Sequence, residues 1–331
     1  MASIQYLALE LTTLALYALT WWHAKQRGLW SELCSATIFG ILLELGQMAF
    51  FGTYHYSERF WFTIGPAPLI IGLCWGIIIY GAMAYSDQLG LAAWAAPFAD
   101  ALWALLLDLS FDAIAIRLGF WSWAIPLEAG YFGVPAENFI GWIAVAFGFS
   151  ALTRRIRRRR DARRRTWLQL GVPLTAYAVL WSATIGFRGL VALLPGADAA
   201  AGDGMWLVVA LMILFATIVV IAAWRVGLDP RRGIDLIPAL GRWSMHGYYL
   251  GWAVLLLIAP SLRLPGMDLP PFLIGMALLL LAVEALMVLP LLRRHAGLRE
   301  QIQLRPVVTQ NVARRHRSTA LTARLAPWSD S

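Results

Sequence analysis

The sequence is poor in charge. Of its 331 residues, only 14% are Asp, Glu, Lys or Arg, whereas 60% are hydrophobic. A soluble domain has about a quarter charged residues and about half apolar ones, so this shortage excludes an ordinary water-soluble globule. In a bilayer, long uncharged runs become the outer surface of the protein. The 17 Trp and ten Tyr residues fit the same environment, because amphipathic rings gather at the membrane–water interface.

Cysteine is also scarce. Cys34 and Cys74 each lie in an apolar run, and neither has the spacing of a metal-ligand motif. The pair predicts no disulfide framework. His55 has no second histidine at a spacing suited to a metal site. We therefore predict no metal centre.

The excess of positive charge lies in one segment. Residues 154–165 contain nine Arg and one Asp, which accounts for the whole net charge of +8. A compact basic loop between two apolar runs is what the positive-inside rule places in the cytoplasm. We predict that it contacts anionic lipid headgroups and does not bind nucleic acid.

The apolar runs predict an all-α fold, a polytopic transmembrane bundle of about nine helices. The N-terminus lacks the basic start of a cleavable signal, so we expect its first run to be retained. The expected spans are 4–22, 33–53, 62–84, 91–116, 138–153, 167–187, 205–224, 245–262 and 271–292.

The cations of the connections predict the orientation. Most of them follow odd-numbered spans, which places the N-terminus outside and the C-terminus in the cytoplasm, as in a bacterial cytoplasmic (inner) membrane. These cations are Lys25, Arg27, the arginine run, Arg225, Arg231, Arg232, Arg242, Arg293, Arg294 and Arg299. The run also divides the chain into a five-span bundle (1–153), the basic loop (154–165), a four-span bundle (166–292) and a basic polar tail (293–331).

Several carboxylates lie inside the apolar runs. Such a group is costly in lipid, so it normally faces the bundle interior and has a partner or a task. Asp108 and Asp112 are four residues apart and share one helical face. With Glu44 they are expected at similar depth, where burial favours the protonated, proton-donating form. The alternative is pairing with Arg117 or Arg59. Asp100 and Glu284 are also intramembrane candidates, but each stands alone in the sequence.

Glycine, proline and aromatic residues gather beside these acids. They form the segments FGTYHY (51–56) and GPAP (65–68) and much of 117–142. Such composition predicts a structured, non-helical connection. Backbone of this kind occurs within the membrane only where other parts of the protein cover it.

The order of these pieces resembles the carotenoid biosynthesis protein family, which includes the membrane carotenoid hydratases of the bisanhydrobacterioruberin and γ-carotene type. The likeness covers about residues 35–150, and its most specific part is NFIGW (138–142). The family usually has Asp-Pro where this chain has Asp112-Ala113, and we match no motif from Thr166 onward.

The resemblance implies hydration of the terminal double bond of an acyclic carotenoid, without a cofactor. Asp108 or Asp112 would donate the proton, and Glu44 would orient water with Tyr54 or Asn138. Aromatic faces would stabilise the carbocation. The substrate-binding residues expected on this basis are Tyr54, Tyr56, Trp75, Trp121, Trp123, Tyr131, Asn138 and Trp142.

Other functions use the same residues. An end-group cyclase would protonate the alkene in the same way but exclude water. A non-catalytic subunit would bind pigment or lipid, with a membrane-protein partner at the C-terminal half. A transporter would use the acids as proton relays, although the two halves show no paired repeats or matched broken helices.

Overall fold

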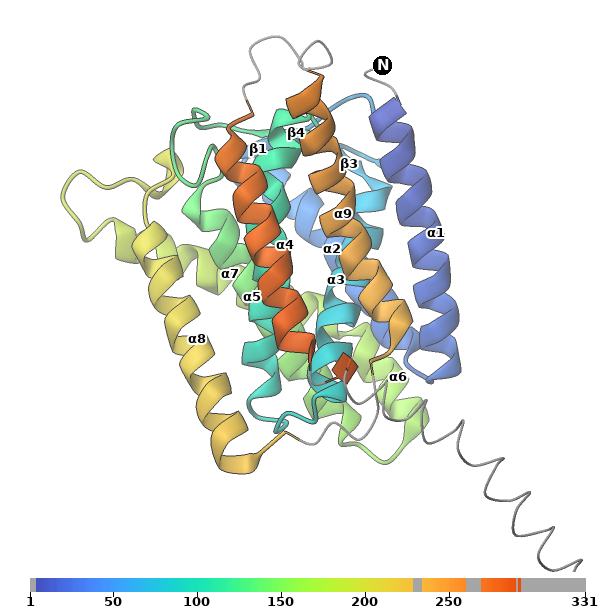
Figure 1. The fold of residues 1–331 in the computed structure, drawn as a ribbon. Helices are drawn as coiled ribbons and strands as arrows, with labels where there is room; N and C mark the ends of the chain where they lie inside the picture. Colours follow the sequence, from blue (N-terminus) through green and yellow to red (C-terminus); the bar gives the residue numbers. More distant parts are fainter. Residues whose placement is uncertain (1–3, 229–233, 260–268, 290, 293–331) are drawn as a thin grey trace, which may run out of the picture.

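The computed structural model describes residues 4–228, 234–259, 269–289 and 291–292. Ten α-helices run through these ranges, and most of them lie lengthwise in one bundle (Figure 1). They are α1 (Ile4–Gln26), α2 (Trp30–Phe50), α3 (Leu69–Gln88), α4 (Ala96–Arg117), α5 (Ala136–Arg157), the short α6 (Ala162–Leu170), α7 (Val172–Val191), α8 (Met205–Val226), α9 (Leu236–Ile258) and a last helix, Pro271–Leu289. The all-α class is therefore confirmed.

Six of these helices are long and apolar enough to cross a membrane, which indicates an integral membrane protein. They are α2, α3, α5, α7, α8 and Pro271–Leu289. The remaining long helices, α1, α4 and α9, carry buried polar side chains that lower their hydropathy. Helix α4 has almost no exposed surface, so it needs no apolar coat. The nine expected spans thus correspond to nine long helices in the described ranges. Six of these helices have both the length and the hydropathy needed to cross a membrane.

Two helices begin well away from their predicted starts, and the expected span 167–187 includes the end of α6 and most of α7. The third helix begins at Leu69 instead of residue 62, because residues 63–68 form a small hairpin of β2 (Thr63–Ile64) and β3 (Ala67–Pro68). The helix expected at 245–262 is α9, which begins at Leu236. Its earlier start places Arg242 inside the bundle with none of its surface exposed. The expectation that Arg242 belongs to a cytoplasmic loop is therefore wrong. A buried ion pair allows the helix to start earlier than its hydropathy suggests.

That ion pair joins α9 to the last helix. Arg242 Nη2 lies 2.6 Å from Glu284 Oε2, and both side chains are fully buried. His246 Nε2 lies 3.2 Å from the same oxygen, and Ser110 Oγ on α4 lies 2.7 Å from His246 Nδ1. Glu284, alone in the sequence, thus has partners in space.

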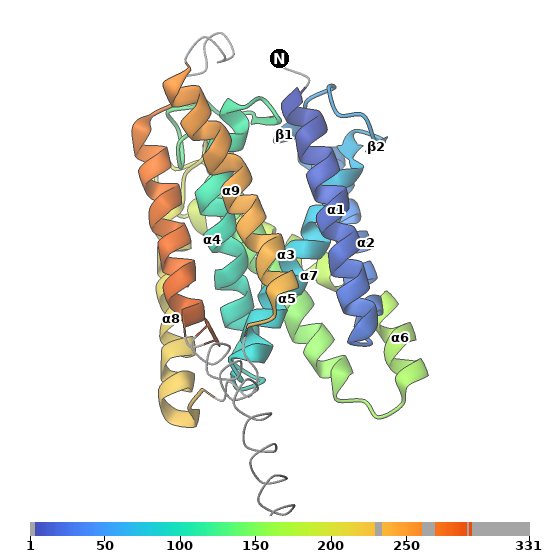
Figure 2. The same ribbon diagram turned by 45° about the vertical axis from the view of Figure 1, so that its right-hand side comes forward.

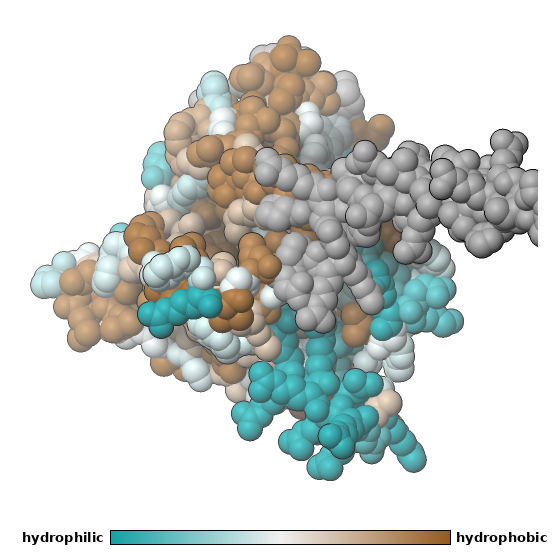
Figure 3. Space-filling model, turned by 60° about the horizontal axis from the view of Figure 1, so that its bottom comes forward, coloured by the Kyte–Doolittle hydropathy of each residue, from teal (hydrophilic) through white to brown (hydrophobic). Residues whose placement is uncertain are grey.

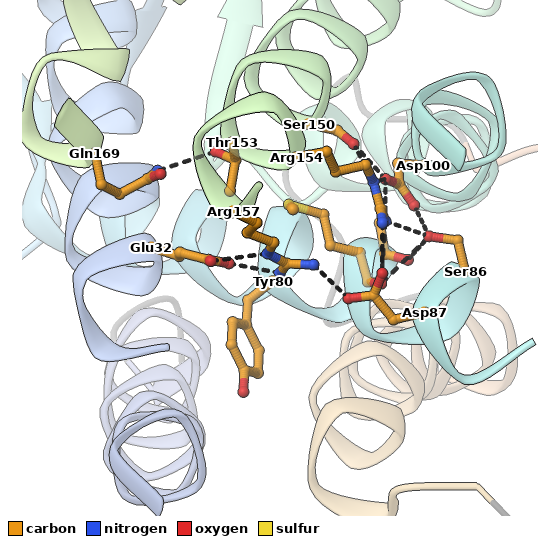
Figure 4. A network of polar contacts seen from close by, with 12 residues as sticks. Glu32, Tyr80, Ser86, Asp87, Asp100, Ser150, Thr153, Arg154, Arg157 and Gln169 are labelled. Atoms are coloured by element: carbon orange, nitrogen blue, oxygen red, sulfur yellow. Dashed lines mark hydrogen bonds and ion pairs between the residues drawn. The ribbon is translucent and has the colours of Figure 1, made fainter. Parts of the chain in front are cut away.

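The end of the bundle near α6 is charged. Figure 4 shows Arg154 and Arg157 turned inward from α5 toward acids of other helices. Arg154 Nη2 lies 2.9 Å from Asp100 Oδ2, and Arg157 donates two hydrogen bonds to Glu32. Asp87 contacts both arginines. Asp100 is therefore also paired, and the expected basic loop begins as the last turns of α5.

The other arginines of the run are exposed on that end. Arg155, 158–160 and 163–165 are exposed, and Figure 3 shows hydrophilic side chains gathered there. The C-terminal ends of α1, α5 and α8 lie at this same end of the bundle (Figure 1). Lipid contact by these arginines, the side of the membrane they face and the division into two bundles stay predictions. Arg231, Arg232, Arg263, Arg293, Arg294, Arg299 and the tail 293–331 lie outside the described residues.

Helices α2 and α3 approach each other closely through glycine. A Cβ atom built on Gly40 would lie 2.4 Å from Trp75 Cβ, and one on Gly76 would lie 2.4 Å from Thr37 Oγ1. Only a residue without a side chain fits at such separations. This packing brings Trp75 of α3 against the face of α2 that also carries Glu44.

Candidate functional site

A two-stranded ribbon covers the loop end of the bundle beside the carboxylates. Strand β1 (Tyr54–Tyr56) pairs antiparallel with β4 (Trp121–Trp123), so that Tyr54 faces Trp123 and Tyr56 faces Trp121. Side chains alternate along a strand, which puts these four aromatic residues on one face. His55 lies on the other face, with its Nε2 2.9 Å from Ser122 Oγ.

Glu44 on α2 accepts three hydrogen bonds. Tyr54 and Tyr56 donate their hydroxyls to Oε2 at 2.6 and 2.7 Å, and Trp75 Nε1 donates to Oε1 at 2.8 Å. Burial, followed by the charge of Glu44, raises the pKa of both tyrosines well above the ordinary value. They are therefore neutral donors. Both oxygens of Glu44 accept hydrogen bonds, which suits a carboxylate that accepts a proton or orients a water molecule.

The two aspartates of α4 share one amide. Asn138, in the first turn of α5, donates from Nδ2 to Asp108 Oδ2 at 2.9 Å and to Asp112 Oδ2 at 2.8 Å. Trp121 Nε1 donates to Asp112 Oδ1 at 2.6 Å. The i,i+4 spacing and a helix that starts after Pro135 together bring this amide between the acids.

One oxygen of this group has no partner. Asp108 is fully buried, and its Oδ1 makes no hydrogen bond within the described ranges. A buried carboxylate oxygen without a donor is costly when ionised. The structure records no ion pair for Glu44, Asp108 or Asp112 among the residues it describes. Arg117, one expected partner, donates from Nη1 to the carbonyl oxygens of Ala113 and Phe132 at 2.8 Å each.

The three acids line one cavity, of about 1330 Å³ when the space in its mouths is counted. It is a candidate active site because acids and apolar walls converge there. The ring centroids of Trp75 and Trp142 are 4.3 Å apart, and Phe111 packs against Trp142. The predicted residues among its walls are Glu44, Tyr54, Tyr56, Trp75, Asp108, Asp112, Trp121, Trp123, Asn138 and Trp142.

Tyr131 is the one predicted site residue that is not among the lining residues. Its hydroxyl donates to the Leu109 carbonyl at 3.1 Å, and its ring packs against Phe139. Burial, followed by the charge of Asp108, raises the pKa of Tyr131 to about 12. It packs beside α4, and a substrate contact for Tyr131 stays a prediction.

Sequence reasoning missed several lining residues. Helix α1 contributes Thr12 and Thr13, and α9 contributes Tyr248 and Tyr249. Glu137 also lines the cavity, where Arg188 of α7 holds it with two hydrogen bonds of 2.8 and 2.9 Å. No local motif marks these positions, because each depends on contacts between distant helices. Within the described ranges, no group of three or more His, Cys, Asp or Glu residues is arranged to hold a metal ion.

A sequence model described as carotenoid biosynthesis protein matches residues 3–211. The match includes the acids, Asn138 and the β1–β4 ribbon, and it confirms the family resemblance. It also extends beyond Thr166 through α7 and into α8, a region without a motif that resembles the family by sequence alone. No curated protein and no solved structure matches the chain.

Proposed function

The chain belongs to the carotenoid biosynthesis protein family, and on that basis we propose that it hydrates the terminal double bond of an acyclic carotenoid. The observation that carries the proposal is the cluster of three buried acids in one cavity, without an ion pair among the described residues. Hydration of an alkene begins with a proton and ends with the addition of water. The cavity must therefore supply a proton donor and a water site. We place the protein in a bacterial cytoplasmic membrane, where a polyene of this kind dissolves.

Asp108 is the proton donor in this proposal. Its unpartnered Oδ1 can carry the proton and face the alkene, while Asn138 holds Oδ2. Transfer of the proton to the less substituted carbon breaks the π bond and leaves a tertiary carbocation. The faces of Trp121 and Trp123 stabilise that cation. Asp112 accepts hydrogen bonds from Trp121 and Asn138, and its carboxylate form adds to the same stabilisation.

Glu44 is the base in this proposal. A water molecule beside it forms the new C–O bond at the tertiary carbon, and the water's extra proton passes to the carboxylate cluster. The sum is one alkene and one water giving one tertiary alcohol, so no oxidant, reductant or cofactor takes part. Tyr54 and Tyr56 keep Glu44 fixed in this position.

The experiment is expression in a host that accumulates an acyclic carotenoid, followed by pigment extraction and mass spectrometry. A hydratase adds the mass of one water molecule at each reacted end and yields a more polar pigment. A new cyclic end group without a mass change would identify a cyclase instead. Unmodified carotenoid that co-purifies with the protein, with no new product, would identify a pigment-binding subunit.

A further inference from the structure

The cavity walls change in chemistry from one side of the bundle to the other. One part, which we call the apolar arm, lies between α1, α3 and α9 and is lined mainly by Leu9, Thr12, Thr13, Leu16, Ile78 and Met245. The other, which we call the polar arm, is lined by Gln47, Thr53, Glu137, Thr184, Ala199 and Ala200, with the apolar Ile125 and Leu180 on the same side. Helix α1 packs on α3 and α9, whereas α7 packs on α2, α5 and the short 3₁₀ helix η1 (Ala199–Ala201). The two arms therefore lie against different helices.

Each arm includes a lining residue that is exposed. Thr12 on α1 is exposed although it lines the cavity. On the other side, Ala124, which follows β4, and Ala200 of η1 are likewise both lining and exposed. A residue that is both lining and exposed marks a place where the cavity reaches the surface. Figure 2 shows α1 and α9 diverging toward the end of the bundle that carries β1. Both helices contribute lining residues to the apolar arm.

The surroundings of the two mouths are opposite in polarity. Beside Thr12, Leu11 and Leu14 expose 57% and 39% of their surface, as expected for a helix that faces hydrocarbon. Beside Ala200, the exposed residues include Asp198 and Asp203, which require water. The bidentate Glu137–Arg188 pair makes the inner rim of the polar arm hydrophilic as well.

We propose that the cavity has two entrances, one for each reactant: the polyene enters from the bilayer between α1 and α9, and water enters beside η1 through the polar arm. The inference rests on the proposed hydration, because only that reaction needs both reactants at one carbon. The acids of α2 and α4 lie where the arms meet. A long apolar chain thereby reaches the acids without crossing water, and water reaches them without crossing lipid.

A matched pair of threonines tests whether water enters through the polar arm. The test measures thiol labelling and does not depend on enzymatic activity. Thr184 and Thr13 are both buried, with 1% and 3% of their surface exposed, and both line the cavity, one in each arm. Each is changed to cysteine in a Cys34→Ser, Cys74→Ser background, and the protein is reconstituted in lipid nanodiscs. The probe is sulfonatoethyl methanethiosulfonate, a charged reagent that stays in water.

We expect Thr184→Cys to be labelled and Thr13→Cys to be protected. Adding Ala200→Trp should abolish labelling of Thr184→Cys by blocking the mouth. Equal labelling of the two cysteines, or protection of both, would overturn the polar entrance. This result is independent of whether the chain hydrates anything.

The apolar entrance is tested by pigment binding. Thr12→Trp should remove the acyclic carotenoid that co-purifies with the wild-type protein, because the bulky ring fills the mouth. Leu11→Trp, at the adjacent exposed position outside the cavity lining, should retain the pigment. Equal retention in both variants would overturn the entrance between α1 and α9. A wild-type protein that binds no carotenoid, yet shows the expected thiol pattern, would refute the proposed substrate and leave the water entrance standing.

Discussion

Tyr56 and Trp121 face each other across the β1–β4 ribbon, and each donates a hydrogen bond to a different buried carboxylate. Their ring centroids are 5.9 Å apart. Tyr56 holds Glu44 of α2, and Trp121 holds Asp112 of α4. The ribbon therefore fixes the separation of two acids that come from helices far apart in the sequence. Two short strands that pair with each other thus help to set the geometry of the site.

Replacing Trp121 by Phe should impair the reaction. The variant keeps an aromatic ring but removes the indole N–H that donates to Asp112. A hydrogen bond to a charged group contributes about 1.5–3 kcal/mol, so a loss of roughly tenfold or more in product formation is expected. Initial rates in membranes with added acyclic carotenoid measure it. Trp142→Phe is the matched control because its ring packs at a tilt against Trp75, and equal losses in the two variants would contradict the role of the N–H group.

Gly40→Ala should destabilise the protein, although alanine is the better helix former. The new methyl group would lie 2.4 Å from Trp75 Cβ, which is fixed to the backbone of α3, so α2 and α3 must separate. Such overpacking costs about 1–3 kcal/mol. Gly186→Ala on α7 is the control, because nothing lies within 4 Å of its Cβ position. Thermal unfolding in detergent should show a lower midpoint for Gly40→Ala alone, and an unchanged midpoint would refute the close packing of these helices.

Arg242→Met should be more harmful than removal of the whole ion pair. The single variant leaves Glu284 buried and without its guanidinium partner, at a cost of about 3–5 kcal/mol. In Arg242→Met, Glu284→Leu no unpaired charge is left, so most of the loss should be recovered. The thermal midpoints of the two variants and the wild type decide the matter. A double variant less stable than Arg242→Met would mean that the pair contributes more than mutual neutralisation.

The sequence is informative where the signal is local. The four-residue spacing of Asp108 and Asp112 predicts their shared face, and the glycine- and proline-rich segments predict the break between helices. The pairing of Tyr56 with Trp121 could not be predicted, because it joins strands more than 60 residues apart. Hydropathy does not predict the early start of α9 for a similar reason. The charge of Arg242 is neutralised by Glu284, 42 residues further along the chain.

Contacts between distant segments also explain why the sequence does not predict the partners of single residues. Asp100 and Glu284 look alike in sequence, as lone acids in apolar runs, and the structure gives each an arginine. Asp108 has different surroundings: an amide on one oxygen and no partner on the other among the described residues. Aromatic composition predicts Trp121 and Tyr131 equally well as cavity residues, yet only Trp121 lines the cavity.

The most direct test of the catalytic account is the product formed by Asp108→Asn in a host that accumulates an acyclic carotenoid. The amide keeps the shape of the side chain but cannot donate an acidic proton. Glu58→Gln, at an exposed loop position, is the control for expression and pigment access. The account predicts that Asp108→Asn still co-purifies with the carotenoid but forms no hydroxylated product, while Glu58→Gln matches the wild type. Hydroxylated carotenoid at the wild-type level in Asp108→Asn would contradict it.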